Sequence, residues 1–179
     1  TNLFPNSQEP TRGIFNKQQF AELAKLCKLK VVSPIPWHHF SKAPDRETIE
    51  GIDVYHPRYF MIPKIWHSLY GVFFFISLLG KIKEISRDYK FDLIFATWAY
   101  PDGFGSFLIA KVLNKPVIIK VHGSDVNIYT KSILRKKMVS YALRNSNKVI
   151  AVSNALKQKL VAIGVPAEKI QVIPNGVDM

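Results

Sequence analysis

Residues 117–125 read Val-Ile-Ile-Lys-Val-His-Gly-Ser-Asp, a short apolar, β-branched run that ends in a small polar loop. A second run, Val149–Val152, ends in Ser153-Asn154, and a third leads through Val172-Ile173-Pro174 into Asn175-Gly176-Val177-Asp178. Runs of this kind are typical of parallel strands, which are buried on both faces and present polar groups at their carboxyl ends. The sequence therefore predicts a parallel sheet with chemistry at one edge.

Strand-like and helix-like segments alternate along the chain. We expect strands at Asn2–Phe4, Lys30–Ser33, Ile52–His56, Leu93–Thr97, Val117–Val121, Val149–Val152 and Gln171–Ile173. Helices are expected at Ile14–Cys27, Lys64–Tyr89, Asp102–Leu113, Lys131–Asn145 and Asn154–Ile163, with an irregular segment at Pro34–Gly51. Strands joined through such helices imply right-handed crossovers. The predicted fold class is α/β, a doubly wound, Rossmann-like parallel sheet with helices on both faces.

Composition limits the class of protein. The chain has 179 residues, enough for one domain, and its 47% of hydrophobic residues excludes intrinsic disorder. The single cysteine, Cys27, shares a helical face with Phe20 and Leu23, so we expect it in the core of a protein from a reducing compartment. The longest apolar run, Leu69–Leu79, is too short to cross a bilayer, which requires about 20 residues.

The net charge of +12 calls for a physical explanation. Lys and Arg are spread over the whole length and are densest at Arg135-Lys136-Lys137. Nucleic-acid binders concentrate their charge and interleave exposed aromatic residues with it, whereas here the aromatic residues lie mainly in apolar runs. We therefore expect no nucleic acid, and favour an anionic membrane surface or a negatively charged small substrate over plain solubility.

The expected helix Lys64–Tyr89 carries two apolar stripes. One stripe, expected to dock on the sheet, consists of Ile65, Leu69, Val72, Phe73, Ile76 and Leu79. The other, nearly opposite, consists of Tyr70, Phe74 and Leu78, with Lys81 at its end. Two interpretations of the second stripe stay open: cover by the segment Pro34–Gly51, or contact with a lipid-linked acceptor or membrane surface, helped by Lys81, Lys83 and Arg87.

Several common catalytic signatures are missing from the sequence. The histidines His38, His39, His56 and His67 have no consistent ligand spacing, so no metal site is expected. There is no Asp-x-Asp pair, no Gly-x-Gly-x-x-Gly and no Gly-x-Ser-x-Gly. The missing Asp-x-Asp pair argues against transferases that bind a diphosphate through a metal. The other two absences argue against dinucleotide enzymes and against hydrolases with a nucleophile elbow.

In order and spacing, five pieces of the chain resemble the N-terminal domain of family 4 glycosyltransferases, which are two-domain enzymes of the GT-B fold. The pieces are Phe4-Pro5 through Arg12-Gly13, Phe91–Ile94, His122–Asp125, Asn147–Ser153 and Lys169–Asp178. The resemblance implies that residues 1–179 form one acceptor-side domain, with a boundary near 174–179. The nucleotide-sugar-binding domain, which in this family carries a Glu-x7-Glu pair, would then lie outside this chain.

The resemblance also assigns roles to residues of the predicted carboxyl edge. It implies that His122 is catalytic and faces the donor sugar near the transfer point, where it can donate a hydrogen bond in either protonation state. Gly123 would permit close approach of the backbone to a ligand. Asp125 would either fix the loop, which we favour, or accept from a sugar hydroxyl. Ser153 is expected to cap the next helix, whose N–H groups could instead meet an anion or hydroxyl.

Two further loops are candidates for substrate binding, the first from the resemblance and the second from its own residues. Arg12-Gly13 resembles the family's glycine loop near the donor diphosphate, with Arg12 in place of a frequent second glycine and able to pair with a phosphate. Trp98, Tyr100 and Asp102 form a loop suited to stacking on a sugar and accepting its hydroxyls, or else to packing.

Two expectations concern the ends of elements. Asp102 is also expected to cap the following helix. Asn175 is expected to meet His122 and Ser153 on the same edge of the sheet, although the three are far apart in the chain.

The resemblance implies transfer of a sugar, with retention, from a nucleotide-sugar to a glycan or glycolipid acceptor in polysaccharide biosynthesis, without a metal or other cofactor. The expected location is cytoplasmic, with attachment to the inner membrane face. Two alternatives stay open: a nucleotide-sugar epimerase of the same architecture, and a non-catalytic acceptor-binding subunit. Taken alone, the chain is expected to bind nucleotide-sugar weakly and to show no transfer.

Overall fold

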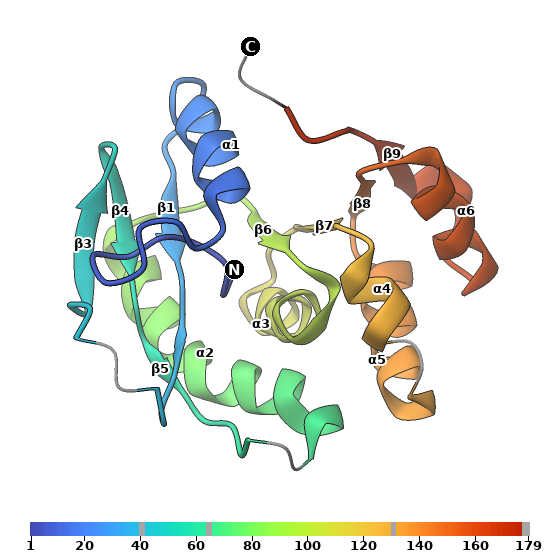
Figure 1. The fold of residues 1–179 in the computed structure, drawn as a ribbon, viewed down its shortest axis with the longest axis horizontal. Coiled ribbons are helices and arrows are strands. Elements are labelled where there is room, and N and C mark those ends of the chain that lie inside the picture. Colours follow the sequence, from blue (N-terminus) through green and yellow to red (C-terminus); the bar gives the residue numbers. More distant parts are fainter. Residues whose placement is uncertain (40–41, 64–65, 130–131, 177–179) are drawn as a thin grey trace. The chain divides into compact units, whose positions relative to one another are not determined.

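The computed structural model describes residues 1–39, 42–63, 66–129 and 132–176 (Figure 1). Its contacts divide the chain into two compact units: unit 1 with residues 1–61 and 175–179, and unit 2 with residues 62–174. Both units combine helices with parallel strand pairs, which confirms the predicted α/β class. The single domain with a boundary near 174–179 stays a prediction.

Unit 1 contains one described helix, α1 (Ile14–Ala24), and two small sheets. The first sheet joins β1 (Lys30–Val32), β4 (Ile52–Tyr55) and β3 (Arg46–Ile49), and the second joins β2 (Ile35–Pro36) with β5 (Arg58–Tyr59). β1 and β4 are parallel, as are β2 and β5, whereas β3 runs antiparallel to β4. An antiparallel edge strand of this kind is common on otherwise parallel sheets.

The segment Pro34–Gly51, which we expected to be irregular, contains β2 and β3, while its residues 40–41 lie outside the described part. A tight two-residue turn joins β3 to β4 through Glu50 at φ +49° and Gly51 at φ +79°. Turns with two positive φ angles usually contain Asn-Gly or Asp-Gly. Because this turn contains Glu-Gly, the sequence did not predict the hairpin.

Two expectations near the amino terminus are also corrected. Asn2–Phe4 is not a strand, although the amino group of Thr1 donates to the carbonyl of Val32 at 3.1 Å and Phe4 is fully buried. Helix α1 ends at Ala24, three residues earlier than expected, and Cys27 is therefore exposed instead of lying in the core.

Unit 2 contains the sheet on which the functional argument rests. Its strands are β6 (Ile94–Thr97), β7 (Val117–Val121), β8 (Lys148–Ala151) and β9 (Ile170–Val172). They are all parallel and lie in the order β6-β7-β8-β9, so each strand pairs with the next one in the sequence. The prediction of four parallel strands is confirmed within two residues at each end.

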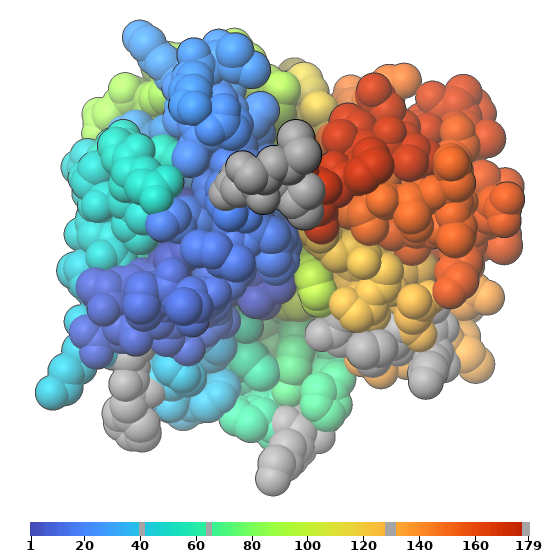
Figure 2. Space-filling view, turned by 45° about the horizontal axis from the view of Figure 1, so that its top comes forward, coloured from blue at the N-terminus to red at the C-terminus, as the bar shows by residue number. Residues whose placement is uncertain are grey.

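The helices of unit 2 connect these strands. They are α2 (Tyr70–Asp88), α3 (Phe104–Leu113), α4 (Ser124–Tyr129), α5 (Ile133–Asn145) and α6 (Asn154–Ala162), with short 3-10 turns at His67–Leu69 and Ala167–Lys169. Residues of β6–β9, α3, α5 and α6 share one hydrophobic core. Figure 2 shows α6 and β9, coloured orange to red, as one continuous part of the surface. Helix α4 was not expected, because the sequence was interpreted as a loop there.

Individual residues explain where α6 begins and where α6 and α3 end. The side chain of Ser153 accepts a hydrogen bond from the backbone N–H of Leu156 at 3.2 Å, so Ser153 is the predicted N-cap of α6. Gly164 follows α6 at φ +90°, and Asn114 ends α3 in the left-handed conformation at φ +50°. Both residue types reach such angles at low cost.

Helix α2 docks through the stripe opposite to the one we expected. Its buried residues are Gly71, Phe74, Leu78 and Ile85, whereas Ile76 of the expected docking stripe is 64% exposed. Residues 64–65, including Ile65 of the expected stripe, lie outside the described part. The second stripe of the sequence analysis, Tyr70, Phe74 and Leu78, is here called the Phe74 stripe. It lies inside unit 2 and is not available for a lipid-linked acceptor or a membrane.

Two glycines make this docking possible. A Cβ atom added to Gly105 of α3 would lie 2.6 Å from the ring of Phe74, and one added to Gly71 of α2 would lie 2.7 Å from the ring of Phe104. Helices α2 and α3 thus approach more closely than any larger residue would allow. Gly71 lies on the same side of α2 as Phe74. A glycine on that side was the feature of the sequence that indicated which stripe is buried.

Two glycine-to-alanine variants of α2 should change stability in opposite directions. Gly71→Ala would press a methyl group into the rings of Tyr100 and Phe104, which costs about 1–3 kcal/mol and outweighs the gain in helix propensity. Gly80→Ala has no atom within 4 Å of its Cβ and should stabilise by about 0.5–1 kcal/mol. Urea denaturation of both variants measures this, and equal stabilisation by both would contradict the packing described.

Candidate functional site

Three connecting segments, the first of which contains a short buried π-helical turn at Ala99–Gly103, follow neighbouring strands at the carboxyl edge of the unit 2 sheet. Trp98–Gly103 follows β6, His122–Asp125 follows β7 and Ser153 follows β8. Because the strands are parallel, these loops leave the sheet at the same edge. The first two loops touch directly, since the backbone N–H of Ala99 donates to the Asp125 carboxylate at 2.7 Å.

Asp125 holds these two loops together. One carboxylate oxygen accepts from the backbone N–H groups of His122, Gly123 and Val126 at 3.0, 2.8 and 3.0 Å, and the other accepts from Ala99. The side chain is fully buried, so burial raises the pKa of Asp125 while the four N–H donors lower it. This is the loop-fixing role favoured from the sequence, and it leaves no exposed carboxylate for a sugar hydroxyl.

His122 is half-buried at the end of β7. Burial, with the nearby charge of Lys120, lowers the pKa of His122 to about 4. The imidazole is therefore neutral near pH 7, with one ring nitrogen that donates and one that accepts. Such a group can form a hydrogen bond without bringing a positive charge to the site.

Trp98 lies against this imidazole. The two ring centroids are 5.5 Å apart with an angle of 29° between the planes, a stacked arrangement. Trp98 has φ +95°, which is rare for a residue with a bulky side chain and costs about 1–3 kcal/mol. One face of the indole is thus taken by His122, and the contact fixes the plane of the histidine ring.

Lys120 is a buried charged residue beside the candidate site that sequence reasoning did not single out. It is 2% exposed, and burial lowers the pKa of its ammonium group. Lys120 and His122 are two residues apart, so they lie on the same side of the chain as it leaves the sheet. The only signal in the sequence was a lysine inside the apolar run 117–121.

The structure buries Tyr100 and Asp102 inside unit 2, so of the two alternatives that the sequence left open for them it favours packing over contact with a sugar. Tyr100 is 1% exposed; its hydroxyl accepts from the N–H of Gly71 at 2.9 Å and donates to the carbonyl of His67 at 3.1 Å. Asp102 is fully buried, and the residue at the N-cap position of α3 is Gly103, so Asp102 is not the helix cap. Both residues serve the packing of the loop.

Gly123 and Ser153 remain accessible at the edge. Gly123 has φ +105° with no atom within 4 Å of an added Cβ, so a glycine is required by backbone conformation and leaves open space beside the main chain. Ser153 is exposed at the start of α6. Both positions fit contact with a ligand, which stays a prediction.

The remaining expected ligand residues belong to unit 1. Arg12 forms an ion pair with Glu9 at 2.8 Å and donates from Nε to the carbonyl of Asn2 at 3.1 Å. Gly13 has φ +60°, and an added Cβ would lie 2.3 Å from the carbonyl oxygen of Leu3, so this position requires glycine. The expected approach of Arg12-Gly13 to a diphosphate stays a prediction.

Asn175 is exposed and also belongs to unit 1. Two residues earlier, the N–H of Ile173 donates to the carbonyl of Ala151 at 2.9 Å, which extends the β8–β9 pairing toward the carboxyl edge. The meeting of Asn175 with His122 and Ser153 stays a prediction. Residues 177–179, with Asp178 of the same motif, lie outside the described part.

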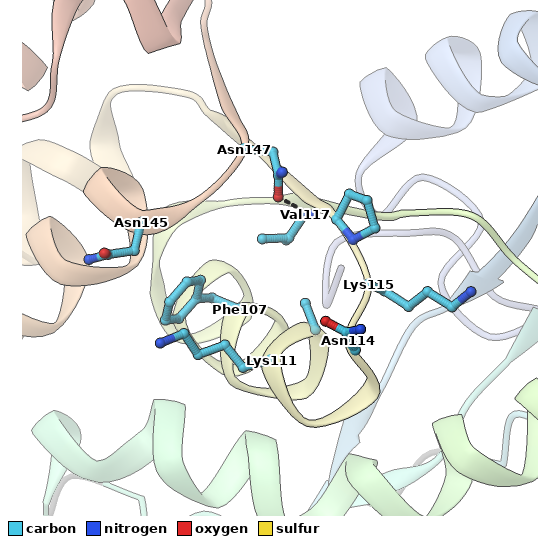
Figure 3. Close-up of a pocket in the computed structure, with 9 residues that line it drawn as sticks. Phe107, Lys111, Asn114, Lys115, Val117, Asn145 and Asn147 are labelled. Carbon is cyan, nitrogen blue, oxygen red and sulfur yellow. Dashed lines mark hydrogen bonds between the residues drawn. The ribbon is translucent and has the colours of Figure 1, made fainter.

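A cavity of about 510 Å³ lies at the opposite edge of the sheet (Figure 3). It is lined by residues at the start of β7 and the ends of α3 and α5, among them Phe107, Lys111, Asn114, Val117 and Asn147. The dashed bond in Figure 3 joins the N–H of Val117 to the side-chain oxygen of Asn147 at 2.9 Å. This cavity lies at the amino ends of the strands and is not part of the candidate site.

A parallel sheet with helices in its crossovers and a His-Gly-Ser-Asp loop at its carboxyl edge defines a Rossmann-like α/β class of protein. The family model described as Glycosyltransferase Family 4 matches residues 18–179. The chain belongs to glycosyltransferase family 4.

Two similar proteins are a curated relative and a solved structure. The chain is 30% identical over 175 residues to a putative teichuronic acid biosynthesis glycosyltransferase, TuaC, of Bacillus subtilis, covering 89% of this chain and 44% of that protein. A sucrose-phosphate synthase structure from Thermosynechococcus elongatus is 19% identical with a TM-score of 0.67, covering 92% of this chain and 86% of that one.

A second solved structure of similar fold contains ligands. Anabaena HepE in complex with UDP and glucose is 21% identical with a TM-score of 0.54, covering 72% of this chain and 32% of that one. At these identities the two structures show the fold alone. The chain spans less than half the length of TuaC, the curated relative described above.

The lowered pKa of His122 can be measured directly. We expect the imidazole resonances of His122, assigned with a His122→Gln variant, to titrate near pH 4 in an NMR experiment. Because the folded pKa lies below the unfolded value of about 6.5, the free energy of unfolding should fall as the pH drops from about 6.5 to 4, by up to about 3 kcal/mol. A midpoint near 6.5 would contradict the burial and charge described here.

The role of Asp125 predicts a graded response to substitution. Asp125→Ala removes an acceptor from four backbone N–H groups, of which that of Val126 retains the carbonyl of Gly123 at 3.1 Å, and should lower the free energy of unfolding by about 3–4 kcal/mol. Asp125→Asn retains one accepting oxygen and should cost about 1–2 kcal/mol. Urea denaturation measures both, with Asp92→Ala as an exposed control expected to stay within about 0.5 kcal/mol. Equal, small effects of all three variants would refute the role.

Proposed function

We propose that this chain is the acceptor-side part of a retaining glycosyltransferase, which moves a sugar from a nucleotide-sugar to a glycan or glycolipid acceptor. The observation that carries the proposal is the position of His122 at the carboxyl edge, where its ring stacks on Trp98 and its backbone N–H donates to Asp125; burial and Lys120 keep the ring neutral. Membership of glycosyltransferase family 4 supports the reaction class.

The state of His122 suits sugar transfer. In this reaction the anomeric carbon develops positive charge while the leaving phosphate develops negative charge. A neutral imidazole can donate a hydrogen bond to an oxygen of the sugar or acceptor without repelling the positive centre, which a protonated ring would do. Packing against Trp98 holds the ring in one orientation, which lowers the cost of positioning it during the reaction.

The other ligand contacts belong to the same proposal. Gly123 and Ser153 would contact substrate at the carboxyl edge of unit 2. Arg12-Gly13 and Asn175 are also proposed as substrate contacts. Trp98 retains a role through His122, whereas the burial of Tyr100, Asp102 and Asp125 removes these three from the proposed contacts.

The donor would bind mainly to a second domain beyond a boundary near 174–179. The HepE complex with UDP and glucose supports a nucleotide-sugar donor for this fold. Taken alone, the chain should therefore bind nucleotide-sugar weakly and transfer nothing.

We also propose the biological process and the cellular location in which the enzyme acts. The name of the TuaC relative supports a role in polysaccharide biosynthesis. Within the described residues, no helix has both the length and the apolar character that a membrane crossing requires. We further propose a cytoplasmic enzyme attached to the inner membrane face; since the Phe74 stripe is buried, other residues must make that contact.

Transfer assays on the full-length gene product test the proposal. Incubation with a panel of nucleotide-sugars should consume donor and form product with retained configuration only when an acceptor glycan is present. His122→Gln should lower kcat about 100-fold, because a transition-state hydrogen bond is lost. His67→Gln, an exposed control, should retain kcat.

Other outcomes identify the alternatives. A change of the donor without acceptor would indicate an epimerase of the same architecture. Acceptor binding without turnover of any donor would indicate a non-catalytic acceptor-binding subunit. An unchanged kcat in the His122→Gln variant would contradict the role given to this residue.

A further inference from the structure

Helix α5 carries an outward row of alternating apolar and basic side chains. Its buried residues are Val139, Ala142 and Leu143. The opposite row consists of Ile133, Lys137, Tyr141 and Arg144, which follow one another at helical spacings of four, four and three residues. All four are exposed, Ile133 to 77% and Tyr141 to 48%.

The neighbourhood of this row is basic. A groove of about 870 Å³ runs beside α5 and is lined on its cationic side by Lys136, Lys137, Arg144 and Lys169. Lys169 is held in place because its ammonium group donates to the carbonyl oxygens of Arg144 at 2.7 Å and Ser146 at 3.0 Å. No acidic residue is among the described residues that line the groove, and α5 itself contains neither Asp nor Glu.

The apolar residues decide which anionic partner fits. Ile133, with Leu134 at 48% exposure, presents bulky aliphatic groups next to the cations. A soluble phosphate would engage only the cations and leave the aliphatic side chains in water. An anionic bilayer meets both, because its head groups carry the negative charge and the acyl boundary beneath them accepts apolar side chains.

Two other partners fit less well. A second copy of the chain would bring another net charge of +12 to the same face, and like charges repel. Nucleic-acid recognition relies on exposed aromatic residues between the cations, and α5 offers Tyr141 alone, with aliphatic residues at the other apolar positions.

We propose that the outer face of α5, with Lys169, is a docking surface for an anionic lipid bilayer. Lys136, Lys137 and Arg144 bind the head groups, and Ile133 and Leu134 enter the interface. This surface replaces the buried Phe74 stripe of α2 as the membrane contact. It refines the proposed setting of the enzyme, but it does not depend on the chemistry of sugar transfer.

Vesicle co-sedimentation tests the surface. The 179-residue chain should bind phosphatidylcholine vesicles that contain 30% phosphatidylglycerol far better than pure phosphatidylcholine vesicles. Each cation near such a surface contributes about fivefold to binding, so Lys136→Glu/Lys137→Glu should weaken it at least about 25-fold. Lys83→Glu/Arg87→Glu makes the same change of charge at exposed positions of α2 and should retain most of the binding.

A second pair of measurements tests the apolar part and the kind of anion. Ile133→Ser/Leu134→Ser, confirmed as folded by circular dichroism, should weaken vesicle binding about tenfold without a change of charge. Soluble glycerol phosphate should not compete with the vesicles. Equal losses in the α2 and α5 charge variants, unchanged binding of the serine variant, or competition by glycerol phosphate would overturn the proposal.

Two further controls separate this proposal from others. Tighter binding to single-stranded RNA than to anionic vesicles, lost in the α5 charge variant, would also overturn it. Transfer to a soluble acceptor by the full-length protein should be unaffected by Lys136→Glu/Lys137→Glu. If the full-length protein transfers sugar but the chain does not bind anionic vesicles, only the docking surface is refuted. If the wild-type full-length protein binds vesicles but transfers no sugar, only the proposed function is refuted.

Discussion

The candidate site depends on one buried carboxylate. Asp125 accepts four backbone N–H groups, from Ala99 in the loop after β6 and from His122, Gly123 and Val126 in the loop after β7. A parallel sheet brings strand ends to one edge, but it does not fix the loops that follow. The Asp125 bonds supply that constraint and determine where the His122 backbone lies.

Electrostatics then sets the character of the site. Lys120 is buried beneath the edge, and its charge adds to burial in keeping His122 neutral. The site thus combines a cation inside the sheet with an uncharged hydrogen-bonding group at its edge. The strained backbone of Trp98 belongs to the same arrangement, because its indole stacks on that histidine.

Much of the fold could be predicted from local patterns, because apolar β-branched runs, helix caps and glycine stops act within a few residues of the chain. The four strands of unit 2 and the Ser153 cap are examples. What local patterns could not predict depends on contacts between distant segments. Phe74 is buried because Gly105 of another helix approaches it, and Tyr100 turns inward because its hydroxyl meets Gly71 and His67.

The central claim is that ligand binds at the carboxyl edge of the unit 2 sheet. Amide chemical shifts of the isotope-labelled chain, recorded during a titration with UDP-glucose to millimolar concentration, test it most directly. The account predicts shifts for Ala99, His122–Val126 and the start of α6, with Lys111–Val117 unchanged. Shifts confined to Lys111–Val117 and Asn145–Asn147, at the cavity on the opposite edge, would contradict it.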